Sequence, residues 1–524
     1  MTSDFYRLRS GSTHKRYLLI VFVLSLISYL VACGGSSKPP APPTPTIPTP
    51  TVALTRLSTD TFTNSSSQHA TEVEPGSFAF GSTIVTAFQV GRIFGGGGSD
   101  IGFATSSDGG VNWHSGFLPG ITTFQGGTFN AVSDPSVAFD SAHNVWLIST
   151  LPLGAFNEIA VSRSADGITW GNPIRISNTP DADKNWIVCD NTPSSAFFGH
   201  CYVEWDDPST TGQGIIWMST STDGGLTWST AVNTAAHDAG IGGVPVVQPN
   251  GTVIVPIEGL AGSMLAFTSS NGGTSWSAAV TISNIFDHQV AGGMRTDPLP
   301  SAGVDGSGTV YVVWHDCRFR TNCTSNDMVL STTNDGVTWS SPTRIPIDAV
   351  TSTADHFISG LGVDPATSGS SAHLGLVYYF YPVANCTTAT CQLGAGFISS
   401  TDGGNTWATP VTLAGPMSLG WLPNTFSGLM VGDYMSTVFS GGKAYPIFTV
   451  ANAKTGSVFD QAVFTTTNAF SAALQQKIAA TKATASGLKD MPLPGAHSDH
   501  PARRFYDLDH EHPIPQKRRV RNRR

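Results

Sequence analysis

Charged side chains are scarce in this 524-residue chain. Asp, Glu, Lys and Arg make up 12% of it, half of the roughly 25% that is usual in globular proteins. Long stretches of Ala, Glu, Lys and Leu are also missing, which excludes coiled coils and helical repeats. Disorder throughout is excluded, because 40% of the residues are apolar and 12 Trp and 28 Phe can fill a large core. The abundant Gly, Ser, Thr, Val and Asp favour an exported β protein.

Basic residues are rare in the middle of the chain. The formal net charge is -9, but residues 1–33 carry +3, Lys38 adds +1 and residues 473–524 carry +6. The remainder holds 11 basic and 30 acidic residues, and such a body repels nucleic acid. Its carboxylates are either solvated or able to bind Ca²⁺, with residues 181–183 and 204–207 as grouped candidates. Neither group has EF-hand spacing, so we assign no cofactor and no metal ligand.

Only one apolar run is long enough to concern a membrane. Residues 17–32 follow four basic residues and are short for a span of about 20 residues. The run ends in Leu30-Val31-Ala32-Cys33, which resembles a bacterial lipobox. The resemblance implies a signal peptide over residues 1–33, a lipid anchor on Cys33 and a place in the bacterial cell envelope, outside the cytoplasm. The alternatives are an ordinary secretion signal and an uncleaved anchor with an incidental Cys. Seven prolines make residues 34–52 a linker.

The CxxC spacing of zinc sites is absent. Six cysteines remain besides Cys33, and they fall into three local pairs separated by 12, 6 and 5 residues. Such pairs suit disulfides in an oxidising compartment, with free buried thiols as the second interpretation. The expected disulfides are Cys189–Cys201, Cys317–Cys323 and Cys386–Cys391.

A turn that ends in Trp recurs six times. Residues 221–228 give its clearest form, Ser-Thr-Asp-Gly-Gly-Leu-Thr-Trp, in which Gly supplies positive φ, Asp caps backbone N–H groups and Trp buries its ring. Counted back from Trp, the second copy has Ala165 and the fifth has Asn334 at the Asp position. The intervals of 57, 58, 48, 63 and 68 residues indicate one unit with variable loops. The tryptophans are Trp113, Trp170, Trp228, Trp276, Trp339 and Trp407.

Each unit has room for two hairpins, which make a four-stranded antiparallel sheet. We therefore predict an all-β fold, a six-bladed β-propeller over residues 53–470. The turn resembles the Asp-box (BNR) repeat of sialidases and related propellers, over about Thr71 to Thr467. In that family the boxes are structural and lie far from the active site, so they indicate the fold and no activity. Residues 471–524 should form a C-terminal helix, up to residue 487, and a basic, disordered tail.

The sialidase resemblance implies an Arg cluster for a carboxylate, an Asp acid/base and a Tyr nucleophile activated by Glu. Asp100 matches the acid/base and Tyr434 the nucleophile, with Arg92, Arg295 and Arg318 as substrate ligands. Simpler interpretations stay open. Asp100 can belong to a polar turn, Arg318 can pair with Asp316, and the hydroxyl of Tyr434 can bind a backbone carbonyl.

Two departures from the family pattern concern activity. The family has an Arg-Ile-Pro motif ahead of the first blade, whereas the only such motif here, residues 344–346, follows the fifth turn. The Glu expected between the fourth turn and Arg295 is also absent, and Glu204 and Glu258 are the nearest substitutes. Without that Glu, a Tyr with a pKa near 10 is a poor nucleophile. The expectation is a sialidase-like glycoside hydrolase acting on exposed glycans or glycoconjugates. The alternative is a non-catalytic surface propeller that binds glycan or protein.

Overall fold

The computed structural model describes residues 45–176, 181–208, 214–471 and 477–479. The expected signal peptide, the lipobox cysteine, most of the linker and the whole basic tail lie outside these residues. Within them the chain is all-β, with 3-10 turns as its only helices. No helix among them is both long and apolar enough to cross a membrane. The 3-10 turns are η1 (Thr123–Gln125), η2 (Ala291–Gly293), η3 (Thr321–Cys323), η4 (Gly369–Ser371) and η5 (Leu419–Trp421).

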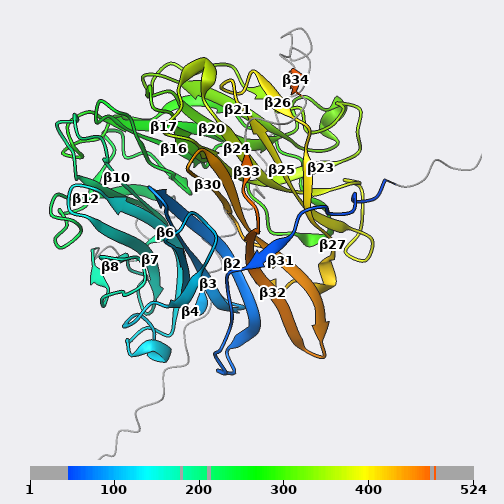
Figure 1. The fold of residues 1–524 in the computed structure, drawn as a ribbon, viewed down its shortest axis with the longest axis horizontal. Coiled ribbons are helices and arrows are strands. Elements are labelled where there is room, and N and C mark those ends of the chain that lie inside the picture. Colours follow the sequence, from blue (N-terminus) through cyan, green and yellow to red (C-terminus); the bar gives the residue numbers. More distant parts are fainter. Residues whose placement is uncertain (1–44, 177–180, 209–213, 472–476, 480–524) are drawn as a thin grey trace, which may run out of the picture. The chain divides into compact units, whose positions relative to one another are not determined.

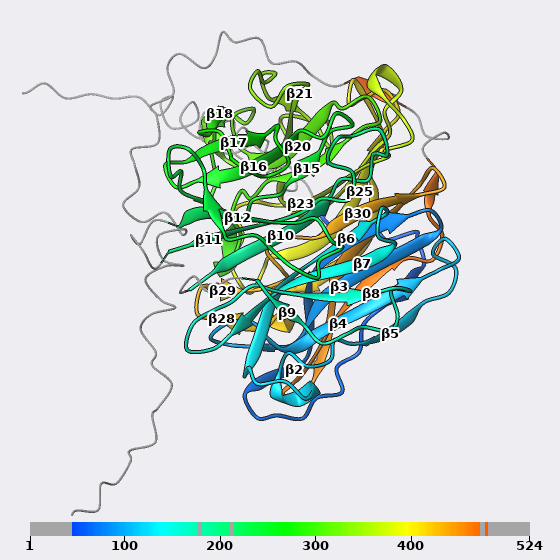
Figure 2. The same ribbon diagram turned by 90° about the vertical axis from the view of Figure 1, so that its left-hand side faces the viewer.

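The strands follow one another in antiparallel groups (Figures 1 and 2). Group 1 holds β2 (Ser67–Phe80), β3 (Thr83–Ile93), β4 (Gly98–Ser106) and β5 (His114–Phe117). Group 2 holds β6 (Ala131–Asp140), β7 (Val145–Leu153), β8 (Ala160–Ser164) and β9 (Ile174–Arg175). Group 3 holds β10 (Asp183–Cys189), β11 (Cys201–Asp207), β12 (Ile215–Ser221) and β13 (Val232–Asn233).

The next three groups repeat this order. Group 4 holds β14 (Gly240–Ile241), β15 (Val246–Val247), β16 (Val253–Gly259), β17 (Ser263–Ser269) and β18 (Val280–Asn284). Group 5 holds β19 (Ser301–Val304), β20 (Val310–Asp316), β21 (Asp327–Thr333) and β22 (Thr343–Arg344). Group 6 holds β23 (Asp355–Val363), β24 (Leu374–Tyr381), β25 (Gln392–Ser400) and β27 (Val411–Ser418).

A last group carries no Trp-ended turn. It holds β30 (Ser436–Ser440), β31 (Lys443–Thr455), β32 (Val458–Thr466) and, added from the start of the body, β1 (Leu54–Arg56). A hairpin of β28 (Asn424–Thr425) and β29 (Gly428–Leu429) precedes it. The described residues thus hold seven groups, and the predicted count of six is not confirmed. The count missed group 7 because it recognised units only by their turn motif.

Two short strands lie in the region where we expected the C-terminal helix to begin. β33 (Phe470–Ser471) pairs with β31, and β34 (Lys477–Ala479) pairs with β26 (Thr406–Ala408). These pairings give the backbone cross-strand partners, so the described parts of residues 471–487 are strand and not helix. The rest of that segment lies outside the described residues.

Neighbouring groups pack face to face in cyclic order. The first strands contact one another from β2 through β6, β10, β15, β19 and β23 to β30, and β30 contacts β2. A separate buried apolar cluster fills each interface, including the one between group 7 and group 1. No sheet closes on itself by hydrogen bonds, although groups 7, 1 and 2 share one ladder. Side-chain packing therefore joins the remaining groups.

The Trp-ended turns have the predicted hydrogen bonds. In group 1 the hydroxyl of Ser106 donates to Asp108, which also accepts the N–H groups of Val111 and Asn112 at 3.1 and 2.9 Å. The indole of Trp113 donates to the Gly110 carbonyl. These bonds to the charged carboxylate lower the pKa of Asp108 to about 2.

The second and fifth turns need a corrected register. The hydroxyls of Ser164 and Thr333 donate to Asp166 and Asp335, so these two residues hold the Asp position, and not Ala165 and Asn334. Both turns have lost one residue between Asp and Trp, which shifted a count made backwards from Trp. The backbone bonds to the carboxylate are kept in both.

Candidate functional site

Charged side chains lie at bulges in three of the inner strands. Glu74 in β2, Asp134 in β6 and Lys184 in β10 each have a left-handed backbone, with φ of 58°, 45° and 47°. At each position the register with the next strand shifts, which marks a bulge. A bulge redirects a side chain out of the regular alternation. Three neighbouring groups use it to bring a charge to the same place.

These side chains meet two more from the segments that precede β19 and β30, and the five form what we name the central cluster: Glu74, Asp134, Lys184, Arg295 and Asp433. The Nζ atom of Lys184 lies 2.5 Å from Asp433, 3.4 Å from Asp134 and 3.7 Å from Glu74. Arg295 donates Nε and Nη2 to the two carboxylate oxygens of Asp433, at 2.8 and 2.5 Å. All five residues are buried.

Asp433 carries the negative charge on which the cluster depends. Burial acts to raise the pKa of its carboxyl, but Arg295 and Lys184 outweigh it and hold the pKa far below its usual range. Conversely, burial acts to lower the pKa of Arg295 and of Lys184, and the nearby carboxylates raise both. The ionised triad is therefore stable across the physiological pH range.

Two carboxyls beside this triad titrate near neutrality. Burial raises the pKa of Glu74 to about 7, against the opposing charge of Lys184. Burial, with the charge of Asp433, raises the pKa of Asp297 to about 7, against Arg295. Glu74 is held by the amide of Gln89 and by the N–H of Asp433 at 3.1 Å. Groups with such pKa values can donate or accept a proton at neutral pH.

A cavity of about 560 Å³ runs inside the body. Asp134, Lys184 and Tyr434 border it at the cluster, and most of its remaining wall is apolar. All seven first strands contribute to that wall, through Ser77, Val137, Ile187, Val246, Ala302, Leu361 and Val438 among others. Polar groups that converge at one end of an apolar cavity are typical of small-molecule sites.

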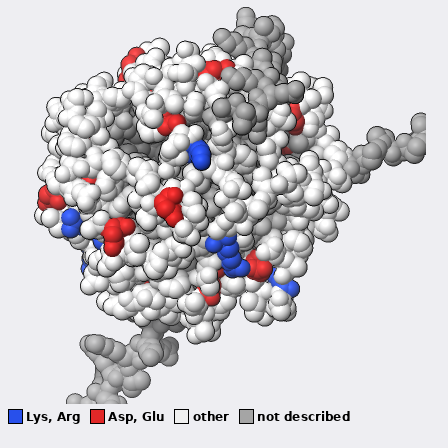
Figure 3. All heavy atoms as spheres, viewed as in Figure 1, with Lys and Arg blue, Asp and Glu red and all other residues white. Residues whose placement is uncertain are grey.

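The exterior gives no competing charged site on one face. In the part of the chain that the structure describes, Figure 3 shows charged side chains lying singly or in small groups, with neither sign gathered into a broad patch. The face drawn in Figure 3 therefore offers no basic surface for a polyanion, which agrees with the small number of basic residues, 11, in the body.

Tyr434 borders the cavity, but its hydroxyl is engaged. It donates to the Pro135 carbonyl at 3.2 Å, and its ring lies 5.2 Å from the ring of Trp186 in a T-shaped pair. Burial raises its pKa well above 10, and the charges of Glu74, Asp134 and Asp433 raise it further. This is the hydrogen bond that the simpler interpretation of Tyr434 foresaw.

Two of the three predicted arginines reach the cluster. Arg295 belongs to it, and Arg92 lies close enough for its charge to interact with Arg295 and Glu74 while its guanidinium donates to the Gly97 carbonyl at 2.8 Å. Arg318 lies apart. It pairs with its near neighbour Asp316 at 2.7 Å. The structure thus brings Arg92, Arg295 and Tyr434 together and leaves Arg318 outside.

Asp100 lies in β4, away from the cavity wall. One carboxylate oxygen accepts the N–H of Ile101 at 2.8 Å and the other accepts the hydroxyl of Thr122 at 3.1 Å. It is fully buried, and burial raises its pKa to about 7. The polar turn that we considered is therefore a buried strand position with local partners.

This burial gives Asp100 a measurable effect on stability. Its pKa is 3.8 when exposed and about 7 when folded, so its contribution is complete below pH 4 and is lost as the pH rises through 7. We expect an Asp100→Asn variant to reduce the fall in unfolding free energy between pH 4 and 7 by about 1.4 kcal/mol per pH unit. Urea denaturation at three pH values measures it, with Asp460→Asn at an exposed site as the matched control. An unchanged slope would contradict this burial effect.

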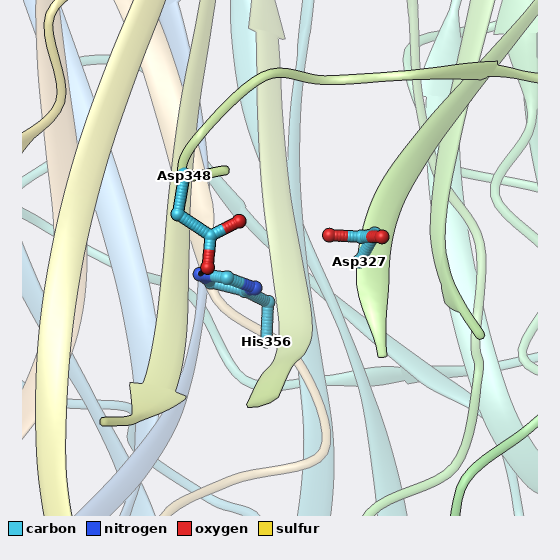
Figure 4. A group of neighbouring side chains, drawn as sticks. All are labelled: Asp327, Asp348 and His356. Carbon is cyan, nitrogen blue, oxygen red and sulfur yellow. Dashed lines mark ion pairs between the residues drawn. The ribbon is translucent and has the colours of Figure 1, made fainter. Parts of the chain in front are cut away.

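One group of side chains has metal-ligand spacing. Among the described residues, Asp327, Asp348 and His356 place one ligand atom each within 4.8 Å of one another, and Figure 4 shows Asp348 beside His356 with Asp327 across from them. Two guanidiniums occupy the same space: Arg320 lies 2.6 Å from Asp327, and Arg344 lies 2.8 Å from it. The carboxylates are thus neutralised by arginines, and the donor set does not fit a cation.

The two acidic groups considered for Ca²⁺ do not form such a set either. Glu204 is fully buried in β11, neither of its oxygens has a hydrogen-bond partner, and burial raises its pKa well above 4.5. A neutral carboxyl packed against Gly243 is a poor calcium ligand.

The three cysteine pairs are disulfide-bonded as predicted.

The sequence contained a signal for the central cluster that we did not use. An acidic residue stands before Pro at the start of an apolar run in three units, as Glu74-Pro75, Asp134-Pro135 and Asp297-Pro298. Pro cannot donate to a sheet ladder and is found at bulges and strand starts. The recurring acid–Pro pair thus marks the bulge in β2 and in β6, and the segment that leads into β19.

No known protein family matches the sequence, and no curated protein matches it. Solved structures do resemble the fold. The ulvan lyase of polysaccharide lyase family PL25 is 10% identical over 76% of this chain and 95% of its own, with a TM-score of 0.44. A Trypanosoma rangeli sialidase in complex with an inhibitor is 12% identical over 76% of this chain and 55% of its own, with a TM-score of 0.40.

A Dyadobacter fermentans protein of unknown function is also similar. It is 15% identical over 67% of this chain and 99% of its own, with a TM-score of 0.41. The similar structures thus include sialidases and other carbohydrate-active enzymes. At these identities the similarity concerns fold alone, so chemistry has to be argued from the side chains of this chain.

Proposed function

We propose that the chain is a glycoside hydrolase of sialidase-like type that acts on exposed glycans, with its reaction at the central cluster. The observation that carries this proposal is the pairing of an ionised carboxylate, Asp433, with a carboxyl of raised pKa, Asp297, beside Arg295. Two carboxyls whose environments separate their pKa values are the usual machinery for cleaving a glycosidic bond.

The roles follow from the charges. Asp297 is 8% exposed and protonated below pH 7, so it is the group able to give a proton to the leaving oxygen. Asp433 stays ionised and faces the positive charge that develops at the sugar carbon. Tyr434 is less suited to be the nucleophile, since the surrounding carboxylates raise its pKa further. It can instead position the sugar at the cavity.

A specific sialosidase is the finer form of this proposal. Arg92 and Arg295 support it, whereas Arg318 does not, because it pairs with Asp316 outside the cluster. The non-catalytic alternative has its own support. Asp433, Asp134 and Glu74 already neutralise Lys184 and Arg295, so an uncharged glycan can lie on the cluster without breaking an ion pair.

We further propose that the seven groups are the blades of one propeller and that a lipid on Cys33 holds it at the bacterial envelope. The cyclic packing supports the first point. Three disulfides support the second, because they form outside the cytoplasm.

The test is hydrolysis of nitrophenyl glycosides, with a sialoside among them, by the purified chain. We expect the rate to fall as the pH rises above 7, where Asp297 loses its proton, and an Asp297→Asn variant to lose about 10²- to 10⁴-fold in kcat. Asp100→Asn, the same change at the carboxyl that the sequence favoured, should keep its activity. Loss of activity in Asp100→Asn but not in Asp297→Asn would assign the acid role to Asp100. Full activity in both variants would show that neither carboxyl is the acid.

A further inference from the structure

Two Phe side chains are exposed on the loops that follow β3 and β7. Phe94 is 50% exposed in the loop between β3 and β4, and Phe156 is 63% exposed in the loop between β7 and β8. Burying a Phe stabilises a protein by about 1.5–3 kcal/mol, so exposed rings that lie together usually mark a contact surface. Neither ring has a role in the central cluster.

The two loops contact each other. The segment after Phe94 is Gly95-Gly96-Gly97, and a Cβ atom added at Gly97 would lie 2.7 Å from the Leu153 side chain. A Cβ atom at Gly154 would lie 3.4 Å from the Phe156 carbonyl and 3.3 Å from the Phe129 ring. Phe94 and Phe156 thus lie on touching loops, with Phe129 beside the second loop, and we name these three residues the aromatic face.

The aromatic face is continuous with the central cluster. Arg92 precedes Phe94 by two residues and donates to the Gly97 carbonyl at 2.8 Å. On the other side, the N–H of Phe426 donates to the Phe94 carbonyl at 3.4 Å, and the next residue, Ser427, accepts a hydrogen bond from Arg295 at 3.1 Å. The hairpin of β28 and β29 therefore connects the exposed ring to a member of the cluster.

We propose that the aromatic face binds the sugar rings of an extended glycan whose neighbouring residue lies at the central cluster. The C–H faces of a pyranose are apolar and flat, so they stack on Phe while the hydroxyls stay in water. The face provides more than one ring, and its ligand is accordingly an oligosaccharide or polysaccharide. This inference rests on the proposed function, because it assigns further sugar-binding positions to the same site.

The charge of the side chains around the aromatic face favours a glycan over a membrane surface as its ligand. The basic residue beside the face, Arg175, has its guanidinium 5.8 Å from the Phe129 ring and is paired with Glu158. Contact with acidic lipid needs free basic side chains around the apolar ones. A neutralised arginine in an acidic body is better matched to an uncharged or weakly charged polymer.

The experiment measures binding of the full chain to arabinan, an uncharged polymer, by calorimetry, with the polyanions ulvan and sialylated mucin as comparisons that should bind more weakly. Phe94→Ala and Phe156→Ala should each weaken binding of the retained polymer about 2- to 10-fold, and the double variant more. Phe94→Trp should restore it. Leu226→Ala is the matched control, because Leu226 is 53% exposed in the Trp-ended turn of residues 221–228 and does not border the cavity.

Three outcomes would overturn the proposal: binding of none of the polymers, equal binding by the double variant, or a loss of adsorption to phosphatidylglycerol vesicles in place of a loss of glycan binding. Failure of the proposed function looks different. If Asp297→Asn and the unmodified chain are both inactive on glycosides, while polymer binding depends on Phe94 and Phe156, the aromatic face stands and the hydrolase does not.

Discussion

An Asp433→Asn variant should lose about 3–5 kcal/mol of unfolding free energy, because it leaves two buried cations without their shared partner. Asp433 binds Arg295 through both carboxylate oxygens and Lys184 through one. Lys184 would keep only Asp134 and Glu74, at 3.4 and 3.7 Å. Equilibrium denaturation in urea at pH 7 measures the loss.

The pH dependence adds a second readout. The pKa of Asp433 is depressed in the folded state, so its stabilising effect is present above pH 4 and is lost as the pH falls below that. We expect the Asn variant to lack this acid-sensitive part. The matched control is Asp460→Asn, which breaks an exposed pair with Arg56 and should cost less than 1 kcal/mol. Equal losses in the two variants would show that burial gives the cluster no special weight.

The repeated turn was predictable because its chemistry is local. A Ser or Thr hydroxyl, an Asp two residues on and a Trp a few residues later make bonds within one short segment, so spacing alone reveals six units. Group 7 has no such segment. It is completed by β1, which pairs with β32 although the two strands lie at opposite ends of the body's sequence. No local sequence pattern predicts that pairing.

The site was predictable only where the chain resembled a known pattern. Arg295 and Tyr434 were singled out in this way; Arg295 binds Asp433 in the central cluster, and Tyr434 borders the cavity. Lys184 was missed because its role depends on a backbone bulge at φ 47° that turns it toward Asp433, 249 residues away in the chain. Contacts of this kind depend on the cyclic arrangement of the groups, which a motif count does not give.

Asp100 and Arg318 show what a sequence position leaves undetermined. Each has a residue type and a sequence position like those of a sialidase, but a partner nearby in the chain determines its contacts. Thr122 and the N–H of Ile101 hold Asp100, and Asp316 holds Arg318. Sequence position is a weaker guide than the nearest available partner when a buried polar group has to be satisfied.

The second large effect is expected at the buried ion network of groups 5 and 6. Arg320 is 2% exposed, pairs with Asp327 and Asp348 at 2.6 and 2.7 Å, and donates to the carbonyls of Ala349 and Ser352. An Arg320→Met variant removes four contacts while Arg344 keeps the carboxylates partly paired. We expect a loss of about 3 kcal/mol in unfolding free energy, measured by urea denaturation.

The control for this variant is Arg175→Met, which breaks a pair whose Arg side chain is 61% exposed and should cost less than 1 kcal/mol.

The same ion network determines whether Asp327, Asp348 and His356 can bind a metal ion. His356 donates from Nδ1 to the Asn326 carbonyl, and burial lowers its pKa. The guanidiniums of Arg320 and Arg344 balance the charges of Asp327 and Asp348 without a metal ion. Calcium or zinc should therefore leave the melting temperature of the unmodified chain unchanged. A rise on adding metal that EDTA reverses would show that a cation displaces Arg320 or Arg344 from the carboxylates.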